Sequence, residues 1–220
     1  EHYNLSLHLF EAASKCALVT GDVVGLKLLS DQIQRYAKTF QDKLNSLYYN
    51  VIALAFASQL PESANRSVLV LAQLGEEMPE SYSETEMKFH IEQTKILLQG
   101  YTEQELIDYR MCDDEAKIMA MKFYARLLTT YQLIKPDSQP IVILKMIQLA
   151  MGKGMSPVSP IAFVFFGQLL ARQGDVQDGY LYTQVARKML EQFGTKEIAG
   201  EVIAVSTQIK CFVDPVQVAL

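Results

Sequence analysis

The residues with catalytic or metal-binding chemistry are few in this sequence and lie far apart. Its three histidines, His2, His8 and His90, are not grouped with one another or with a cysteine in any metal-binding spacing. A zinc site needs three or four ligands that converge on one point. We therefore expect no metal site, and no other pattern in the chain predicts a cofactor.

Two short segments carry residue types used in catalysis, and both have a simpler explanation. The acidic triple at 113–115 has the carboxylates of metal binding or acid–base chemistry, but carboxylates are also favoured at the start of a helix, near the positive end of its dipole. The Gly-Lys-Gly segment at 152–156 lacks the spacing of a phosphate-binding loop and follows no strand, so a helix end explains its glycines. Without a catalytic triad, metal cluster or phosphate loop, we expect a protein that is not an enzyme.

The tyrosines suggest protein recognition, because Tyr and Arg are enriched where proteins bind one another. Tyr48 and Tyr49 cannot both point into a core, since neighbouring residues lie about 100° apart on a helix. In stacked helical hairpins the first helix of each pair lines the concave face. We therefore predict an interaction surface on the helices expected at 41–59, 114–134 and 160–173. The residues predicted for it are Tyr49, Arg126, Gln132 and Gln168.

Composition limits the classes of partner and the compartment. The chain has 220 residues, half of them hydrophobic, and a net charge of −5. An acidic chain lacks the basic face that displaces counterions from nucleic acid, so we expect no nucleic-acid partner. No apolar run approaches the roughly 18 residues of a membrane span. The expected partner is a protein.

The cysteines indicate a reducing compartment. Cys16, Cys112 and Cys211 are odd in number and widely spaced, which is typical of a cytoplasmic protein with free thiols. We expect Cys112 to be exposed in a loop and the other two thiols to be buried. The sequence begins within helical pattern and ends at 214–220, and neither end has the look of a natural terminus, so we expect an excised piece of a longer protein.

One turn occurs twice and sets the architecture. The segments 20–23 and 173–176 each place Gly-Asp between two long amphipathic helical patterns. A Gly just after a helix adopts the left-handed conformation at little cost, and the Asp that follows can cap the next helix. Because the two glycines lie 153 residues apart (174 − 21), four intervals would average about 38 residues, a period that suits two-helix repeats.

Helical periodicity extends over most of the chain and predicts an all-α fold with 1–220 as a single helical-repeat domain. Capping boxes at Ser83/Glu86 and Thr102/Glu105 mark two helix starts. The expected hairpins are 3–20 with 22–38, 41–59 with 62–77, 84–99 with 102–110, 114–134 with 138–152, and 160–173 with 176–193, leaving a final helix at 196–213. We predict a right-handed superhelix of about five helix-turn-helix hairpins plus this final helix.

Residues 160–193 resemble the tetratricopeptide repeat. The residues that carry the resemblance are Phe163, Phe166, Gly167 and Leu170 in the first helix, with Gly179 and Ala186 in the second. Small residues at Gly167 and Gly179 would let the two helices approach closely. Thr183 departs from the pattern, because the family usually has a large aromatic residue there.

A wider resemblance covers most of the chain, most clearly from about 141 to 213. The runs 143–150, 154–157, 174–180 and 186–190 are similar to the tetratricopeptide-like region that follows the AAA-type (STAND) ATPase module in large multidomain signalling kinases of the Ser/Thr or histidine kinase type. The resemblance implies a regulatory or scaffolding segment that binds neighbouring domains of its parent chain or a signalling partner. It carries over no catalytic residue. The alternative is a sensor that binds a small ligand on the concave face.

Overall fold

The computed structural model describes residues 2–213. The regular elements in this part of the chain are all helices, with no β-strand among them. The predicted all-α class is therefore confirmed. The α-helices are α1 (His2–Thr20), α2 (Val23–Tyr36), α3 (Leu44–Phe56), α4 (Leu60–Gln73), α5 (Glu84–Gln99), α6 (Glu103–Ile107), α7 (Glu115–Ile134), α8 (Gln139–Lys153), α9 (Pro160–Arg172), α10 (Val176–Phe193) and α11 (Ala199–Val213). Two short 3-10 turns, η1 (Gln41–Lys43) and η2 (Pro136–Ser138), precede α3 and α8.

Both Gly-Asp turns form as predicted. Gly21 and Gly174 have φ values of 73° and 96°. The carboxylate of Asp22 accepts the backbone N–H of Gly25 at 2.8 Å, and Asp175 caps α10 in the same way. The two capping boxes are also present, at the starts of α5 and α6. These turns fix where the helices begin.

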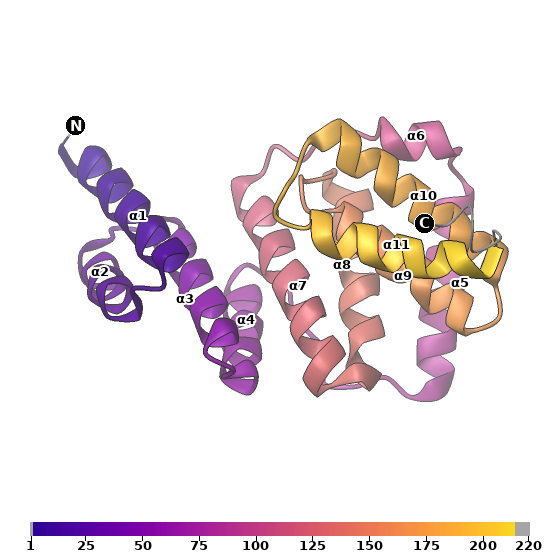
Figure 1. Cartoon of the computed structure of the whole chain (residues 1–220), viewed down its shortest axis with the longest axis horizontal. Coiled ribbons are helices and arrows are strands. Elements are labelled where there is room, and N and C mark those ends of the chain that lie inside the picture. The colour runs from indigo at the N-terminus through magenta and orange to yellow at the C-terminus, as the bar shows by residue number, and fades with distance from the viewer. Residues whose placement is uncertain (1, 214–220) are drawn as a thin grey trace.

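The helices pack as hairpins along the chain, with one exception to the prediction. α1 packs on α2, α3 on α4, α7 on α8 and α9 on α10, while α7 also packs directly on α4. The predicted hairpin of 84–99 with 102–110 does not form, because α6 ends at Ile107 and is too short to cover α5. Instead α5 packs on α8 and α6 on α10. Figure 1 shows α1–α4 extending as an arm from the thicker body of later helices.

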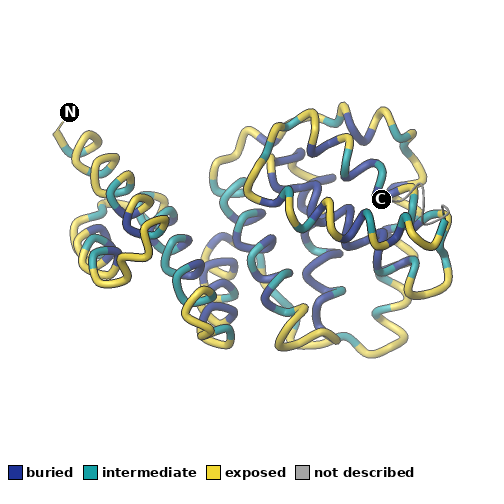
Figure 2. Tube along the Cα trace, viewed as in Figure 1, coloured by how far each residue is buried: buried dark blue, intermediate teal, exposed yellow. Residues whose placement is uncertain are grey.

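One continuous core runs from α3 to α11. Its largest fully buried side chains include Phe123, Tyr124, Phe163 and Phe166 from α7 and α9. By contrast, α1 buries only Ser14 and Ala17. Figure 2 shows this difference as a largely exposed N-terminal arm and a buried centre in the body.

The helices α9 and α10 cross closely, and glycines make that approach possible. A Cβ atom on Gly167 would lie 2.5 Å from the carbonyl oxygen of Gly179, and a Cβ on Gly179 would lie 2.6 Å from that of Gly167. The predicted requirement for small residues at these two positions is therefore confirmed. Thr183 is fully buried beside the crossing.

Lys95 links α5 by ion pairs to the second Gly-Asp turn and the start of α10. Its ammonium pairs with the carboxylate of Asp175 and lies 2.9 Å from that of Asp178, and the Lys95 side chain is only 20% exposed. The hydrogen bond from Lys95 is the main cause that lowers the pKa of Asp175, against a smaller effect of burial. The same hydrogen bonds to Asp175 and Asp178 raise the pKa of Lys95 above its usual range. Both partners are therefore charged at neutral pH.

Removing this ion pair should reduce the acid sensitivity of the protein. Because the pKa of Asp175 is lower in the folded state, its contribution to stability is present above its unfolded value of 3.8 and is lost as the pH falls through the folded value. We expect Lys95→Met to be less stable than wild type at pH 7, and the two proteins to converge toward pH 3. Urea unfolding at a series of pH values measures this. The control Lys88→Met removes an exposed pair on the same helix, with side chains 71% and 83% exposed, and should change little. A constant difference between wild type and Lys95→Met at all pH values would contradict the prediction.

Candidate binding surfaces

Tyr48 and Tyr49 point in different directions from α3, as helix geometry requires. Tyr48 is 5% exposed, and its ring packs edge-on against Phe123 with centroids 5.5 Å apart. Tyr49 is half-buried, with its ring centroid 6.4 Å from that of Tyr48. The prediction that only one of them points into the core is confirmed.

Polar side chains from three distant segments meet around Tyr48. Its hydroxyl donates a hydrogen bond to Glu197, which lies just before α11. Burial is the main cause that raises the pKa of Tyr48, the negative charge of Glu197 raises it further, and Arg126 on α7 opposes the shift. The ammonium of Lys122, one turn before Arg126, lies 5.7 Å from the centre of the Tyr48 ring. We call the group of Tyr48, Tyr49, Arg126 and Glu197 the Tyr48 junction.

The structure brings two of the four predicted surface residues into this junction. Burial, followed by the charges of Glu11 and Glu197, raises the pKa of Tyr49. Arg126 is half-buried, and its Nε has no hydrogen-bond partner among the described residues. The junction therefore holds an arginine donor that the fold itself does not use.

The other two predicted residues lie elsewhere. Gln132 is exposed near the end of α7. Gln168 is only 4% exposed and donates to the side-chain oxygen of Gln208 on α11 at 2.9 Å. It is covered because α11, expected only as a leftover helix, packs across α9. The four residues therefore do not form one continuous open surface, and no signal in the sequence pointed to Glu197.

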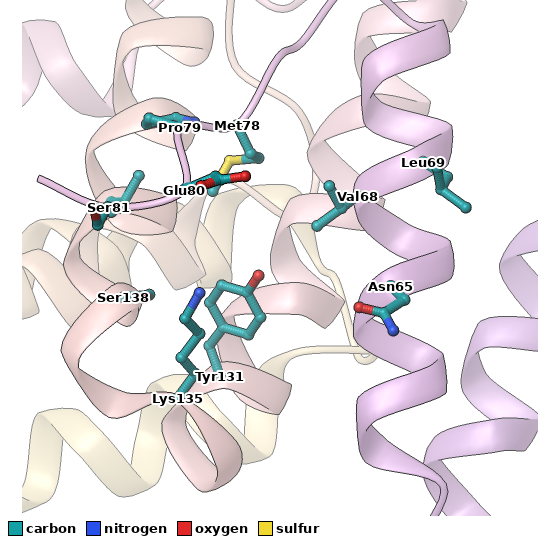
Figure 3. Close-up of a pocket in the computed structure, with 11 residues that line it drawn as sticks. Asn65, Val68, Leu69, Met78, Pro79, Glu80, Ser81, Tyr131, Lys135 and Ser138 are labelled. Atoms are coloured by element: carbon teal, nitrogen blue, oxygen red, sulfur yellow. The ribbon is translucent and has the colours of Figure 1, made fainter.

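A second site is an open cavity of about 730 Å³ between α4 and the end of α7, which we call the α4–α7 groove. The residues that line it are Asn65, Val68, Leu69, Met78, Pro79, Glu80, Ser81, Tyr131, Lys135, Ser138 and Ile141. Figure 3 shows Tyr131 and Lys135 rising into the groove from one side, with Asn65 on α4 and Glu80 in the segment above them. Its volume lies in the range of small-molecule sites, roughly 300–1,000 Å³.

The polar groups of the α4–α7 groove are available to a ligand. The side chains of Asn65 and Glu80 take part in no hydrogen bond or ion pair with any described residue, and the Lys135 ammonium lies 5.8 Å from the centre of the Tyr131 ring. Burial raises the pKa of Tyr131, so its hydroxyl stays neutral at pH 7 and can both donate and accept. A cation, an anion, an amide and a phenol therefore surround an apolar floor. Sequence patterns do not predict this site, because it depends on the segment 78–81 folding back over α7.

The solvent exposure of the three cysteine thiols is the reverse of the prediction. Cys112 is 7% exposed, whereas Cys16 and Cys211 are exposed. Cys112 is buried because its loop pairs with the segment just after α8: its N–H donates to the carbonyl of Met155 at 2.7 Å, and the Met155 N–H donates to the carbonyl of Arg110 at 2.8 Å. The prediction that Cys112 is exposed is wrong, as is the prediction that the other two are buried.

No protein-family model matches the sequence, and neither a curated protein nor a solved structure matches it. Within residues 2–213, none of the helices is both long and apolar enough to cross a membrane. In the same residues, no group of three or more His, Cys, Asp and Glu side chains is arranged to hold a metal ion.

Proposed function

We propose that this chain is a non-catalytic protein-interaction and regulatory segment of a multidomain signalling ATPase/kinase. Its hairpins would belong to a tetratricopeptide-like right-handed superhelix, and its place would be the cytoplasm. The family resemblance of residues 141–213 supports the parent class, and the three free thiols suit a reducing compartment. The structural observation that carries the interaction role is an exposed apolar stripe on α1.

This α1 stripe consists of Leu5, Leu9, Ala12, Cys16 and Val19, all exposed. Leu5, Leu9 and Val19 are 60%, 61% and 79% exposed. The stripe has alternating spacings of four and three residues, which is the apolar repeat of a helix that packs against another helix. The buried face of α1 already contacts α2 and α3, so the stripe presents a second apolar face to solvent. An apolar stripe of this kind suits a partner helix.

Such a partner would act by holding the N-terminal arm. A helix seated on the α1 stripe would favour the conformations of the parent protein in which the arm and the partner lie together, and disfavour the others. The partner would be a neighbouring domain of the same parent chain or a separate signalling protein.

The test compares this chain with the longer protein encoded by its gene. We expect the upstream coding sequence to contain a strand followed by a Gly-rich phosphate loop, and hydrogen exchange in α1 to slow when the encoded neighbours are present. Leu9→Asp should abolish that protection, whereas His8→Asp, an exposed neighbour off the stripe, should retain it. A gene without such a loop, together with unchanged exchange in α1, would overturn the proposal.

The α4–α7 groove favours a second candidate function, a sensor of a small ligand. A thermal-shift screen of metabolites tests it, because a ligand that binds only the folded chain raises the unfolding midpoint. A shift that disappears in Lys135→Met and persists in Lys15→Met would support the sensor. The absence of any shift would reject it.

A further inference from the structure

A separate pocket of about 420 Å³ lies on the face of the arm where α2, η1, α3 and α4 meet. We call it the arm pocket. Its apolar floor includes Phe40, which directly precedes η1, and Leu47 and Val51 of α3. It lies apart from the residues of the α1 stripe and shares only Leu69 with the α4–α7 groove. It therefore concerns a binding event different from the functions proposed above.

The polar lining of the arm pocket has one sign of charge. It consists of two cationic residues, Lys43 and Arg66, and three amides, Gln34, Asn50 and Gln73, with no Asp or Glu. The whole chain has a net charge of −5. A cavity lined by cations and amides in an acidic protein favours an anionic ligand, because the local potential differs from that of the surrounding surface.

Lys43 is the cation best placed to bind an anion. It is half-buried and forms no ion pair with any described residue. Its neighbour Asp42 forms no ion pair with it, because that carboxylate instead accepts hydrogen bonds from the Tyr3 hydroxyl at 2.6 Å and from the Thr39 N–H at 3.1 Å. Arg66 gives one donor to Glu62 on the exposed side of α4 at 2.8 Å, and its two terminal nitrogens remain for a ligand.

Two of the three amides of the arm pocket differ in how the fold uses them. Asn50 donates to Ser30 at 2.6 Å, and Ser30 shares a hydrogen bond of 2.7 Å with Ser46, so the Asn50 side chain is held in place. The side-chain nitrogen of Gln34 is buried and has no acceptor among the described residues. An unused buried donor is unfavourable in the empty pocket, and a ligand oxygen would satisfy it.

We infer that the arm pocket binds a carboxylate attached to an apolar group. One unpaired ammonium beside a partly neutralised guanidinium matches a single negative charge, and the floor of Phe40, Leu47 and Val51 matches an alkyl or aromatic body. The carboxylate could belong to a free organic acid or to an acidic side chain of a peptide. Both sources present the same group to Lys43.

The experiment measures binding of hexanoate and of its neutral isostere hexanamide by calorimetry and by NMR of the labelled chain. We expect hexanoate to bind at least about tenfold more tightly, because the charge-assisted hydrogen bonds are lost in the amide. Lys43→Met should weaken hexanoate binding by a similar factor, Lys43→Arg should retain most of it, and Glu62→Gln should strengthen it by freeing Arg66. Lys27→Met, which removes an exposed lysine of α2 outside the pocket, is the matched control.

A capped dipeptide, acetyl-Leu-Asp-amide, distinguishes the two sources of the carboxylate. Tighter binding of the dipeptide assigns the pocket to an acidic peptide, and tighter binding of hexanoate assigns it to a free organic acid; both support the inference. Equal affinity for hexanoate and hexanamide, or binding unchanged in Lys43→Met, would overturn it. So would the absence of saturable binding of either carboxylate at millimolar concentration.

Discussion

Gly167→Ala should lower the free energy of unfolding by about 3 kcal/mol, the upper end of the usual range for overpacking. The added methyl would lie 2.5 Å from the carbonyl oxygen of Gly179, 2.9 Å from the methyl of Thr183 and 3.2 Å from its backbone nitrogen. Two of these three obstacles are backbone atoms, so no side-chain rotation removes the clash. The helices α9 and α10 would have to move apart within the buried core. Urea unfolding followed by circular dichroism measures the loss.

Gly152→Ala is the matched control for this prediction. Gly152 lies within α8, and a Cβ atom there would meet no other atom within 4 Å. Alanine is the better helix former, so we expect this variant to be about 0.5–1 kcal/mol more stable than wild type. Gly179→Ala should resemble Gly167→Ala, and the double variant should lose less than the sum, because one separation of the helices relieves both clashes. Equal stabilities of the Gly152 and Gly167 variants would show that the crossing tolerates a side chain.

Gly154→Ala should destabilise the protein by about 3 kcal/mol, and it should also expose the Cys112 thiol. Gly154 has φ 112° and ψ 162°, a region that is essentially restricted to glycine. A Cβ there would lie 2.7 Å from the backbone nitrogen of Cys112 and 2.8 Å from the carbonyl carbon of Met111. The pairing of the 110–112 segment with Met155 would be lost, and with it the cover over the thiol.

Thiol titration with an aromatic disulfide reagent reads out this change directly. In the wild type, Cys16 and Cys211 should react quickly and Cys112 slowly, since only Cys112 is buried. In Gly154→Ala we expect all three to react quickly. Gly21→Ala also places alanine at a positive φ, but in open space, so it should cost only about 1–2 kcal/mol and leave Cys112 protected. A slow third thiol in Gly154→Ala would contradict the prediction.

The parts of this fold that were predictable are those fixed by residues within four positions of one another. The Gly-Asp turns and both capping boxes depend on a backbone N–H and a side chain three residues away, so their residue types alone predict them. The separation of Tyr48 from Tyr49 follows in the same way from the angle between neighbouring helix positions. The close approach at Gly167 and Gly179 was predictable because the tetratricopeptide resemblance aligns both positions.

The parts that were missed depend on contacts between segments far apart in the chain. Periodicity shows that 84–99 is helical, but not that it packs on α8 instead of pairing with its neighbour. It likewise gives no sign that α11 covers Gln168 or that Glu197 reaches Tyr48. The α4–α7 groove was missed because a fold-back of the irregular segment 78–81 makes it. Such contacts depend on tertiary packing, which local patterns do not contain.

The bond between Tyr48 and Glu197 joins residues 149 positions apart, and this has a consequence for how the chain is made. In a simple array each repeat touches only its neighbours, so early repeats can finish folding while later ones are still on the ribosome. Here Tyr48 of α3 gains its bond only after Glu197 has been made, and Lys95 of α5 gains its ion pairs only after Asp175 and Asp178 have been made. Nascent α3 could pack on α4 and α7, and α5 on α8, before these polar contacts form. Tyr48 and Lys95 would therefore lack their partners until late in synthesis, and long-range contacts of this kind are the slow ones to form.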